Sequence, residues 1–256
     1  MHIWTIANQK GGVAKTTTTL AFGSLLTQRG HQVLLIDLDP HSSLTRSMGI
    51  AVDPPPVGTL ALFDDNPPAL ADLALASPRA GLDFVAGQAG LATLERQSAS
   101  KPGLGMALNR ALATLGDRYD YVLLDCPPTL GLLMVNALAA TSQLIIPTQT
   151  EPLAVHGLNS MLRTAAMIER SRRRAMPVSI LPTLFDRRTR VAHETLDGLR
   201  QQHPAALCPT AIPVDTRLRA IEHVLGDADG AGRGLTAYQE ALDWLLCQPV
   251  ALESAA

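Results

Sequence analysis

The chain has 256 residues, of which 46% are hydrophobic and 17% charged, and its formal net charge is −2. This composition predicts one soluble globular domain over residues 1–256 and argues against a disordered or globally basic protein. No apolar run is long enough to span a membrane, and the chain enters its first strand without a signal peptide. Its three cysteines are too far apart in the sequence to suggest a metal site or disulfides, so we expect a cytoplasmic protein.

A strand, a glycine-containing loop and a helix follow one another at the start of the chain. Residues 3–7 form a short apolar run typical of a strand, and apolar residues at helical spacing predict a helix over residues 18–29. Between them lies Q-K-G-G-V-A-K-T-T, residues 9–17. A helix N-terminus offers unpaired N–H groups and a positive dipole end, and glycines let the backbone approach phosphates. Lys15 is placed to reach the β- and γ-phosphates and the Thr16 hydroxyl to bind Mg²⁺, so the stretch predicts a nucleotide site.

This loop differs at two positions from the common phosphate loop, G-x-x-x-x-G-K-[ST]. Gln9 and Ala14 stand where that pattern has glycine. If the backbone at Ala14 needs a positive φ, the methyl group strains the loop, because residues other than glycine rarely adopt that conformation.

Acidic residues follow two further strands. Residues 32–36 are mostly apolar, as in a parallel sheet buried on both faces, and they lead into Asp37 and Asp39. Residues 119–124 form a similar strand that leads into Asp125. In open α/β sheets ligands bind at the carboxyl ends of the strands, and an acid there is typical of a Walker B carboxylate that holds Mg²⁺ through water. Three such acids after one phosphate loop favour a ligand site over three unrelated turn residues.

Strands and helices alternate along the rest of the chain. We expect further strands at residues 82–86, 143–147, 178–183 and 211–213. Helices are expected at residues 58–64, 69–76, 87–98, 106–115, 130–139, 151–169, 187–202 and 235–246, and a helix or turn at residues 216–224. His41, Ser42 and Ser43 offer N-caps for a short helix that ends at Met48, and residues 100–105 form a linker. The alternation predicts an α/β fold, a mostly parallel twisted sheet with helices on both faces.

The arginines are concentrated late in the chain. Of 18 arginines, 11 lie between Arg163 and Arg219, a window with only five acidic residues. This window carries a charge of about +6 and the remainder about −8, and a local positive field of that size attracts polyanions. The plain alternative is that these side chains only cover solvated faces. For the cluster as a whole we favour a DNA-binding role over this alternative.

The phosphate loop resembles most closely the deviant Walker A motif of the ParA/MinD family of ATPases, K-G-G-x-x-G-K-[ST]. Lys10 stands in the place of the signature lysine, and Ala14 stands where the family usually has glycine. Five later segments resemble the family in order: residues 33–42 (with His41 where glutamine is usual), 121–136, 146–158, 181–190 and 212–218. The chain starts at its first strand, which is similar to the small Soj-like chromosome-partition members of the family.

This resemblance implies a P-loop NTPase fold of the deviant Walker A type and a Mg²⁺-dependent ATP hydrolase with slow turnover. Two subunits would close over two ATP molecules, with Lys15 binding phosphates in its own subunit and Lys10 reaching the partner's nucleotide. Asp39 would orient the attacking water. The residues implied to bind ATP are Lys10, Gly11, Gly12, Val13, Ala14, Lys15, Thr16 and Thr17. The residues implied to hold Mg²⁺ are Thr16 directly and Asp37 and Asp125 in the outer shell.

The resemblance also implies partners. The ATP-bound homodimer of this family binds DNA without sequence preference, is associated with the nucleoid and is activated by a ParB-like protein, and no membrane is involved. Arg217 falls on a family position used for DNA contact, and Arg200 is a looser match. Arg187, Arg188 and Arg219 are candidates by charge alone, since phosphate contacts by arginine suffice for non-specific binding.

Other functions of the same fold stay open at this point. A family member that positions a protein cargo over the nucleoid would use the same ATPase and DNA chemistry. A MinD-like membrane ATPase needs a basic amphipathic C-terminal helix, whereas residues 247–256 contain no Lys or Arg. An iron–sulfur reductase needs suitably placed cysteines, and we expect Cys126 to be a small buried residue instead. An amide-forming ATP-dependent synthetase needs a substrate pocket that the sequence does not identify.

Overall fold

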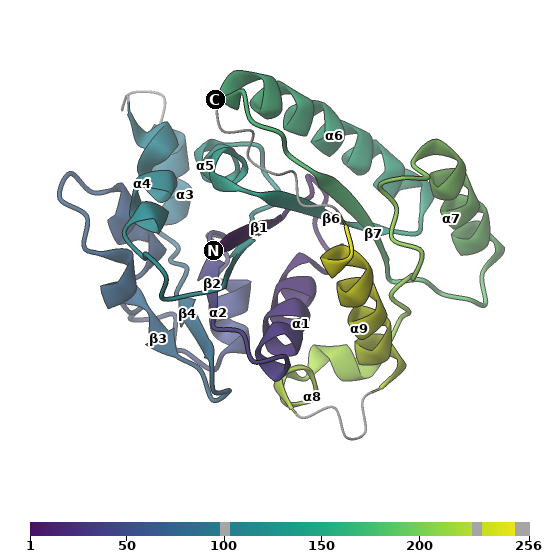
Figure 1. The fold of residues 1–256 in the computed structure, drawn as a ribbon, viewed down its shortest axis with the longest axis horizontal. Coiled ribbons are helices and arrows are strands. Elements are labelled where there is room, and N and C mark those ends of the chain that lie inside the picture. The colour runs from purple at the N-terminus through teal and green to yellow at the C-terminus, as the bar shows by residue number, and fades with distance from the viewer. Residues whose placement is uncertain (98–102, 227–231, 249–256) are drawn as a thin grey trace.

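The computed structural model describes residues 1–97, 103–226 and 232–248. At its centre is a seven-stranded sheet with the strand order β3-β4-β2-β5-β1-β6-β7 (Figure 1). The strands are β1 (His2–Ile6), β2 (Val33–Asp37), β3 (Leu75–Ala76), β4 (Leu82–Val85), β5 (Tyr121–Asp125), β6 (Gln143–Gln149) and β7 (Val178–Thr183). All neighbouring strands are parallel except β3 and β4. The predicted α/β fold with a mostly parallel sheet is therefore confirmed.

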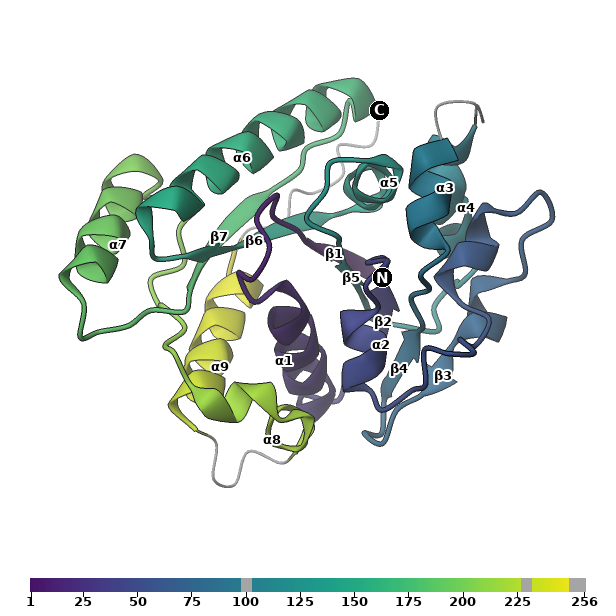
Figure 2. The same ribbon diagram turned by 180° about the vertical axis from the view of Figure 1, so that it is seen from behind.

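Helices cover both faces of the sheet, as Figure 1 and the opposite view in Figure 2 show. One face carries α1 (Lys15–Gln28), α2 (Ser43–Ser47), α8 (Ile221–Leu225) and α9 (Arg233–Leu246). The other carries α3 (Leu91–Gln97), α4 (Ala107–Ala113), α5 (Leu132–Ala140), α6 (Pro152–Arg172) and α7 (Arg190–Gln202). Short 3₁₀ turns lie between them: η1 (Thr59–Phe63), η2 (Leu70–Leu73), η4 (Leu104–Met106) and η5 (Thr216–Arg219).

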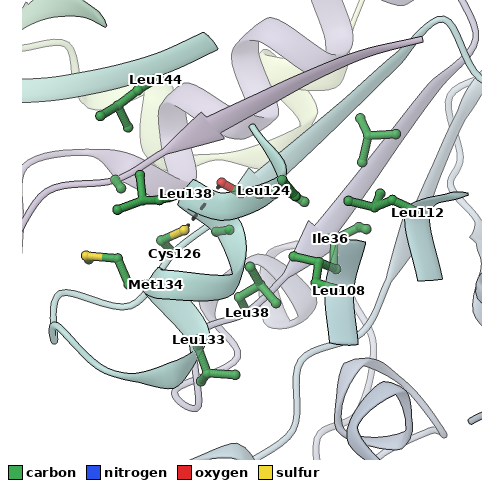
Figure 3. Packing of buried hydrophobic residues seen from close by; sticks show 14 of the residues in the cluster. Ile36, Leu38, Leu108, Leu112, Leu124, Cys126, Leu133, Met134, Leu138 and Leu144 are labelled. Atoms are coloured by element: carbon green, nitrogen blue, oxygen red, sulfur yellow. Dashed lines mark hydrogen bonds between the residues drawn. The ribbon is translucent and has the colours of Figure 1, made fainter. Parts of the chain in front are cut away.

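The central strand β2 shows why these segments are apolar at successive positions. Leu34 and Ile36 pack into the core beside α4 and α5, whereas Val33 and Leu35 pack into the core beside α1 and α9, and all four are fully buried. Successive residues of a strand point to opposite faces, so a strand between two helical layers needs apolar side chains on both. Figure 3 shows part of the first core, in which strand residues meet leucines of α4 and α5. Burying one such side chain stabilises the fold by roughly 1.5–3 kcal/mol. The packing of these strands therefore holds in place the acids at their carboxyl ends.

The predicted helix over residues 69–76 is wrong in its second half. Leu75 and Ala76 form the edge strand β3 and pair antiparallel with Phe84 and Asp83 of β4. Alanine and leucine favour a helix, but that preference is weak, and the hydrogen bonds offered by the open edge of the sheet outweigh it.

The predicted strand over residues 211–213 is not a strand of the sheet. Pro213 makes an isolated bridge with Phe185, flanked by bonds from Phe185 N–H to Ile212 O (2.9 Å) and from Val214 N–H to Phe185 O (3.1 Å). Proline has no N–H group with which to extend a ladder.

Two helix starts also differ from the prediction. Helix α1 begins at Lys15 and not at residue 18, because the polar end of the phosphate loop forms the first turn without an apolar pattern. Ser42 occupies the N-cap position of α2, as predicted, but it has a left-handed conformation with φ 53 and its side chain makes no capping hydrogen bond. Half of the predicted linker at residues 100–105, namely residues 100–102, and the tail from residue 249 lie outside the described residues.

Candidate functional site

The phosphate loop leaves β1 in the middle of the sheet. Strand β1 pairs with β5 on one side and β6 on the other, and β2 lies beyond β5. The chain therefore crosses from β5 on one side of β1 to β6 on the other. Ligand crevices form at the carboxyl ends of the strands where such an order reverses, so the fold places the loop at the expected position.

The backbone of the loop is open, and Ala14 is its strained position. A Cβ atom at Gly11 or Gly12 would meet no protein atom within 4 Å, so a ligand has access to this stretch. Ala14 has φ 68 and ψ 33 at the N-cap of α1, which confirms a positive φ where the family has glycine. For an L-residue with a side chain this conformation costs roughly 1–2 kcal/mol.

Lys15 and Thr16 are held by the loop and by β5. The Lys15 ammonium donates to Lys10 O at 3.1 Å, and the residue is 8% exposed. Burial lowers the pKa of Lys15, and the charges of Asp125 and Asp39 partly offset that effect. The Thr16 hydroxyl donates to Asp125 Oδ2 at 2.7 Å. A buried cation and a hydroxyl therefore lie at the start of α1, where a phosphate and a divalent cation are expected.

Asp37 and Asp125 lie opposite each other at the ends of β2 and β5. Asp37 accepts bonds from Asp39 N–H (3.0 Å) and from the N–H and hydroxyl of Thr45 (2.9 and 2.7 Å). Burial raises the pKa of both carboxyls, and for Asp125 the neighbouring Asp37 charge raises it further. Two buried carboxyls that are poorly stabilised as anions fit a site that receives a cation. Thr45 lies in a short helix without any recognisable motif, so the sequence did not indicate its role.

Asp39 is hydrogen-bonded to His41, the residue that stands where the family usually has glutamine. Its Oδ1 accepts from the His41 backbone N–H and lies against His41 Nδ1, both at 2.9 Å. Asp39 is 8% exposed, and it lines the same cleft as Lys15 and Thr16. The three predicted acids are thus brought together with the loop.

Lys10 does not share the position of Lys15. Its ammonium lies 3.2 Å from Gln149 Oε1 and 3.7 Å from Glu151 Oε2, at the junction of β6 and α6. Gln9, which also departs from the common pattern, donates to Thr164 Oγ1 of α6 at 2.8 Å. The start of the loop is therefore attached to α6, and its end to β5.

Two neighbouring clefts meet at the loop. The larger, about 840 Å³, is bounded by the loop and α1, by the turn after β2, and by η5 and α8. The smaller, about 310 Å³, is bounded by the loop, residues 212–216 and the buried Tyr238 of α9. Arg219 lines both clefts, and Arg46 and Glu222 line the larger one, which the sequence did not indicate.

The arginines predicted to contact DNA differ in their surroundings. Arg188 pairs with Asp186 at 2.8 Å, and Arg200 pairs with Asp197 at 3.0 Å. Arg217 is exposed in η5, and its guanidinium has no ion-pair partner within residues 1–97, 103–226 and 232–248. Arg187 is exposed just before α7. Of the remaining arginines in the window, Arg172 is occupied, since its guanidinium donates to backbone oxygens of residues 138, 174 and 175 at 2.7–3.0 Å.

Three further observations bear on the rival functions. Cys126 is fully buried in the apolar core, as predicted, and Figure 3 shows it beside Met134 and Leu138. Across the described ranges, no group of three or more His, Cys, Asp or Glu side chains is arranged to hold a metal ion by itself. In the described parts of the chain, none of the helices has the length and apolar character needed to cross a bilayer.

Comparison with known proteins gives consistent matches. A family model described as an AAA domain matches residues 1–178. The sporulation initiation inhibitor protein Soj of Bacillus subtilis is 34% identical over 83% of this chain and 84% of its own length. The chromosome partitioning protein ParA of Myxococcus xanthus is 33% identical over 83% of this chain and 75% of its own length.

A solved structure is also similar. The cobyrinic acid a,c-diamide synthase of Mycobacterium smegmatis, crystallised with ADP and magnesium, superimposes with a TM-score of 0.83 and is 33% identical. The match covers 96% of this chain and 94% of that one.

Proposed function

Because the chain belongs to the ParA/Soj family of P-loop ATPases, we propose that it hydrolyses ATP slowly and segregates chromosome or plasmid DNA as an ATP-dependent dimer. The observation that carries this proposal is the separation of the two lysines. Lys15 points back into the loop toward Lys10 O, whereas the Lys10 ammonium lies at the β6–α6 junction, outside its own loop. A lysine that is not engaged by its own phosphate cradle is available to a nucleotide bound by a second subunit.

The nucleotide would lie along the loop. Residues 10–17 would bind the ATP phosphates through backbone N–H groups, Lys15 and Thr17, as anions bind at a helix N-terminus. The Thr16 hydroxyl would bind Mg²⁺, with Asp125 and Asp37 in its outer shell. When bound, Mg²⁺ supplies charge neutralisation at the β- and γ-phosphate oxygens. Asp39 would orient the attacking water. Holding this water and the γ-phosphate in fixed positions would be the source of the rate enhancement.

Arg219 belongs to this nucleotide site in our proposal and not to the DNA-binding surface. It lines both clefts, and its guanidinium has no ion-pair partner among the described residues. The smaller cleft, with Ile212, Pro213 and Tyr238 in its wall, suits the flat apolar face of an adenine base. Arg219 would then lie between the base and the phosphates of ATP, where its positive charge attracts the negative phosphates.

DNA binding would use arginines outside the clefts. Arg217 and Arg187 are the first choices, because they are exposed and lack ion-pair partners within the described residues. Arg188 and Arg200 are second choices, since each would have to exchange a carboxylate for a DNA phosphate. Contacts of this kind carry no sequence information and bring the protein to the nucleoid, where a ParB-like partner would stimulate turnover.

A mobility shift with a non-specific DNA duplex tests this function. We expect a shift with ATP and Mg²⁺ but none with ADP or without nucleotide, and a loss of the shift between about 50 and 200 mM salt. A shift that ignores nucleotide, or no shift at all, would contradict the proposal.

Two alternative functions can be told apart from the proposed one by experiment. A protein cargo instead of a replicon would leave the mobility shift unchanged, and normal DNA segregation in a deletion strain would favour it. The likeness to the Mycobacterium smegmatis structure favours an amide-forming synthase. That activity would appear as ATP consumption dependent on a carboxylic acid substrate and an amide donor, without any DNA shift.

A further inference from the structure

The turn after β2 holds one side chain against the acid that lines the cleft. Ser42 N–H donates to Asp39 O at 2.8 Å, which closes the turn over residues 39–42. The left-handed conformation of Ser42 then starts α2. Pro40 lies inside the turn and fixes its own φ, so His41 has a well-defined backbone position.

His41 occupies one oxygen of Asp39 with two hydrogen bonds. Its backbone N–H donates to Asp39 Oδ1 at 2.9 Å, and its ring Nδ1 lies 2.9 Å from the same oxygen. An ionised carboxylate only accepts hydrogen bonds, so the ring contact requires a proton on Nδ1. The two bonds together fix the rotation of the carboxylate about its Cβ–Cγ bond.

The other oxygen, Asp39 Oδ2, has no hydrogen-bond partner within the described residues. This separates Asp39 from the two neighbouring acids, whose oxygens are all occupied. Asp37 accepts from Asp39 N–H and from Thr45. Asp125 accepts from Thr16 at 2.7 Å and from Thr19 at 3.4 Å. Of the three strand-end acids, Asp39 alone offers an acceptor to a water in the cleft.

We propose that His41 is a positioning residue for ATP hydrolysis: its imidazole holds Asp39 Oδ1 so that Oδ2 accepts a hydrogen bond from the attacking water. This inference rests on the proposed function, because it assumes that Asp39 orients that water. A carboxylate held by a closed turn and a ring nitrogen loses little freedom when the water binds, which is the condition for efficient positioning.

Substitutions at His41 separate positioning from folding. His41→Ala removes the ring donor, and we expect kcat for ATP to fall about tenfold with KM unchanged. His41→Asn places an amide N–H where Nδ1 lies, and we expect it to restore most of the rate. The side chain of His41 is 81% exposed, so both variants should melt like the wild type. A wild-type kcat in His41→Ala, or an equal loss in both variants, would overturn the proposal.

The tautomer of His41 gives a readout that does not depend on hydrolysis. In ¹⁵N NMR spectra of the neutral imidazole, we expect the proton of His41 on Nδ1, moving to Nε2 in an Asp39→Ala variant. A proton on Nε2 in the wild type would show that His41 does not hold Asp39, even if the protein is an active ATPase. An inactive wild type with the proton on Nδ1 would instead contradict the proposed function, while the hydrogen bond from His41 to Asp39 would be supported.

Discussion

Ala14 keeps a left-handed conformation because its neighbours hold it there. Its carbonyl accepts from the Thr18 N–H at 2.9 Å and from the Thr18 hydroxyl at 2.7 Å. The same hydroxyl lies 2.9 Å from the hydroxyl of Tyr238, which is fully buried in α9. Strained residues persist where the surrounding structure over-determines them, and here α1 and α9 do so together.

Replacing Ala14 with glycine should release this strain. Glycine adopts φ 68 without a steric cost, so we expect Ala14→Gly to raise the free energy of unfolding by about 0.5–1 kcal/mol, after its larger unfolded-state entropy is subtracted. Urea denaturation with an unchanged m-value measures this gain. Ala21→Gly in the same helix is the control, because Ala21 is helical and fully buried, and that variant should lose stability. A loss in both variants would mean that Ala14 is not strained.

At the level of helices and strands, prediction succeeded where the hydrophobic pattern was unambiguous. The strands β2 and β5 were predicted because both their faces are buried, and the acids that follow them were predicted to lie at the ligand edge. The two-residue strand β3 was missed, since its pairing depends on an edge that sequence patterns do not show. The side chains that orient the site, such as Thr45 and His41, were not predicted to do so. Their contacts arise from turns that bring together polar residues of no distinctive type.

The pairing of β2 with β5 makes stability depend on pH. It brings Asp37 and Asp125 together, and burial raises their pKa values to about 6 and about 8. Both groups bind protons more strongly in the folded than in the unfolded protein, whose aspartates titrate near 4, so folding is favoured at low pH. The free energy of unfolding of the metal-free protein should therefore fall by roughly 5 kcal/mol as the pH rises from about 5 to about 8.

The Asp125→Asn variant checks this pH dependence. An amide oxygen still accepts the Thr16 hydroxyl, but the variant has no charge to bury, so its stability should fall less steeply with pH. Urea denaturation in EDTA at several pH values compares the two slopes, and titrations elsewhere in the chain cancel in the difference. Identical slopes would mean that Asp125 does not carry the effect.

Across the whole molecule, the two ends of the loop are attached to different elements. Lys15 and Thr16 belong to the cleft and β5, whereas Lys10 contacts Gln149 and Glu151 at the start of α6. If Lys10 serves a second subunit, Lys10→Ala should abolish dimerisation in ATP while one subunit still binds nucleotide. Light scattering and titration with a fluorescent ATP analogue measure the two properties. A dimer that persists in this variant would show that dimerisation does not depend on a contact of Lys10 with the nucleotide of the second subunit.

Two arginines that lie two residues apart in η5 should separate DNA binding from nucleotide binding. Both side chains are exposed, but of the two only Arg219 lines the clefts at the loop. We expect Arg217→Ala to weaken DNA binding and to reduce the slope of log K against log salt by about 1, with ATP affinity unchanged. Arg219→Ala should lower ATP affinity about fivefold to tenfold, the loss of one charge-assisted contact, while DNA binding at saturating ATP stays normal. Each variant is the control for the other, since both remove one positive charge from the same turn. If both lose only DNA affinity, Arg219 returns to the DNA surface and the cleft keeps Lys15 as its phosphate cation.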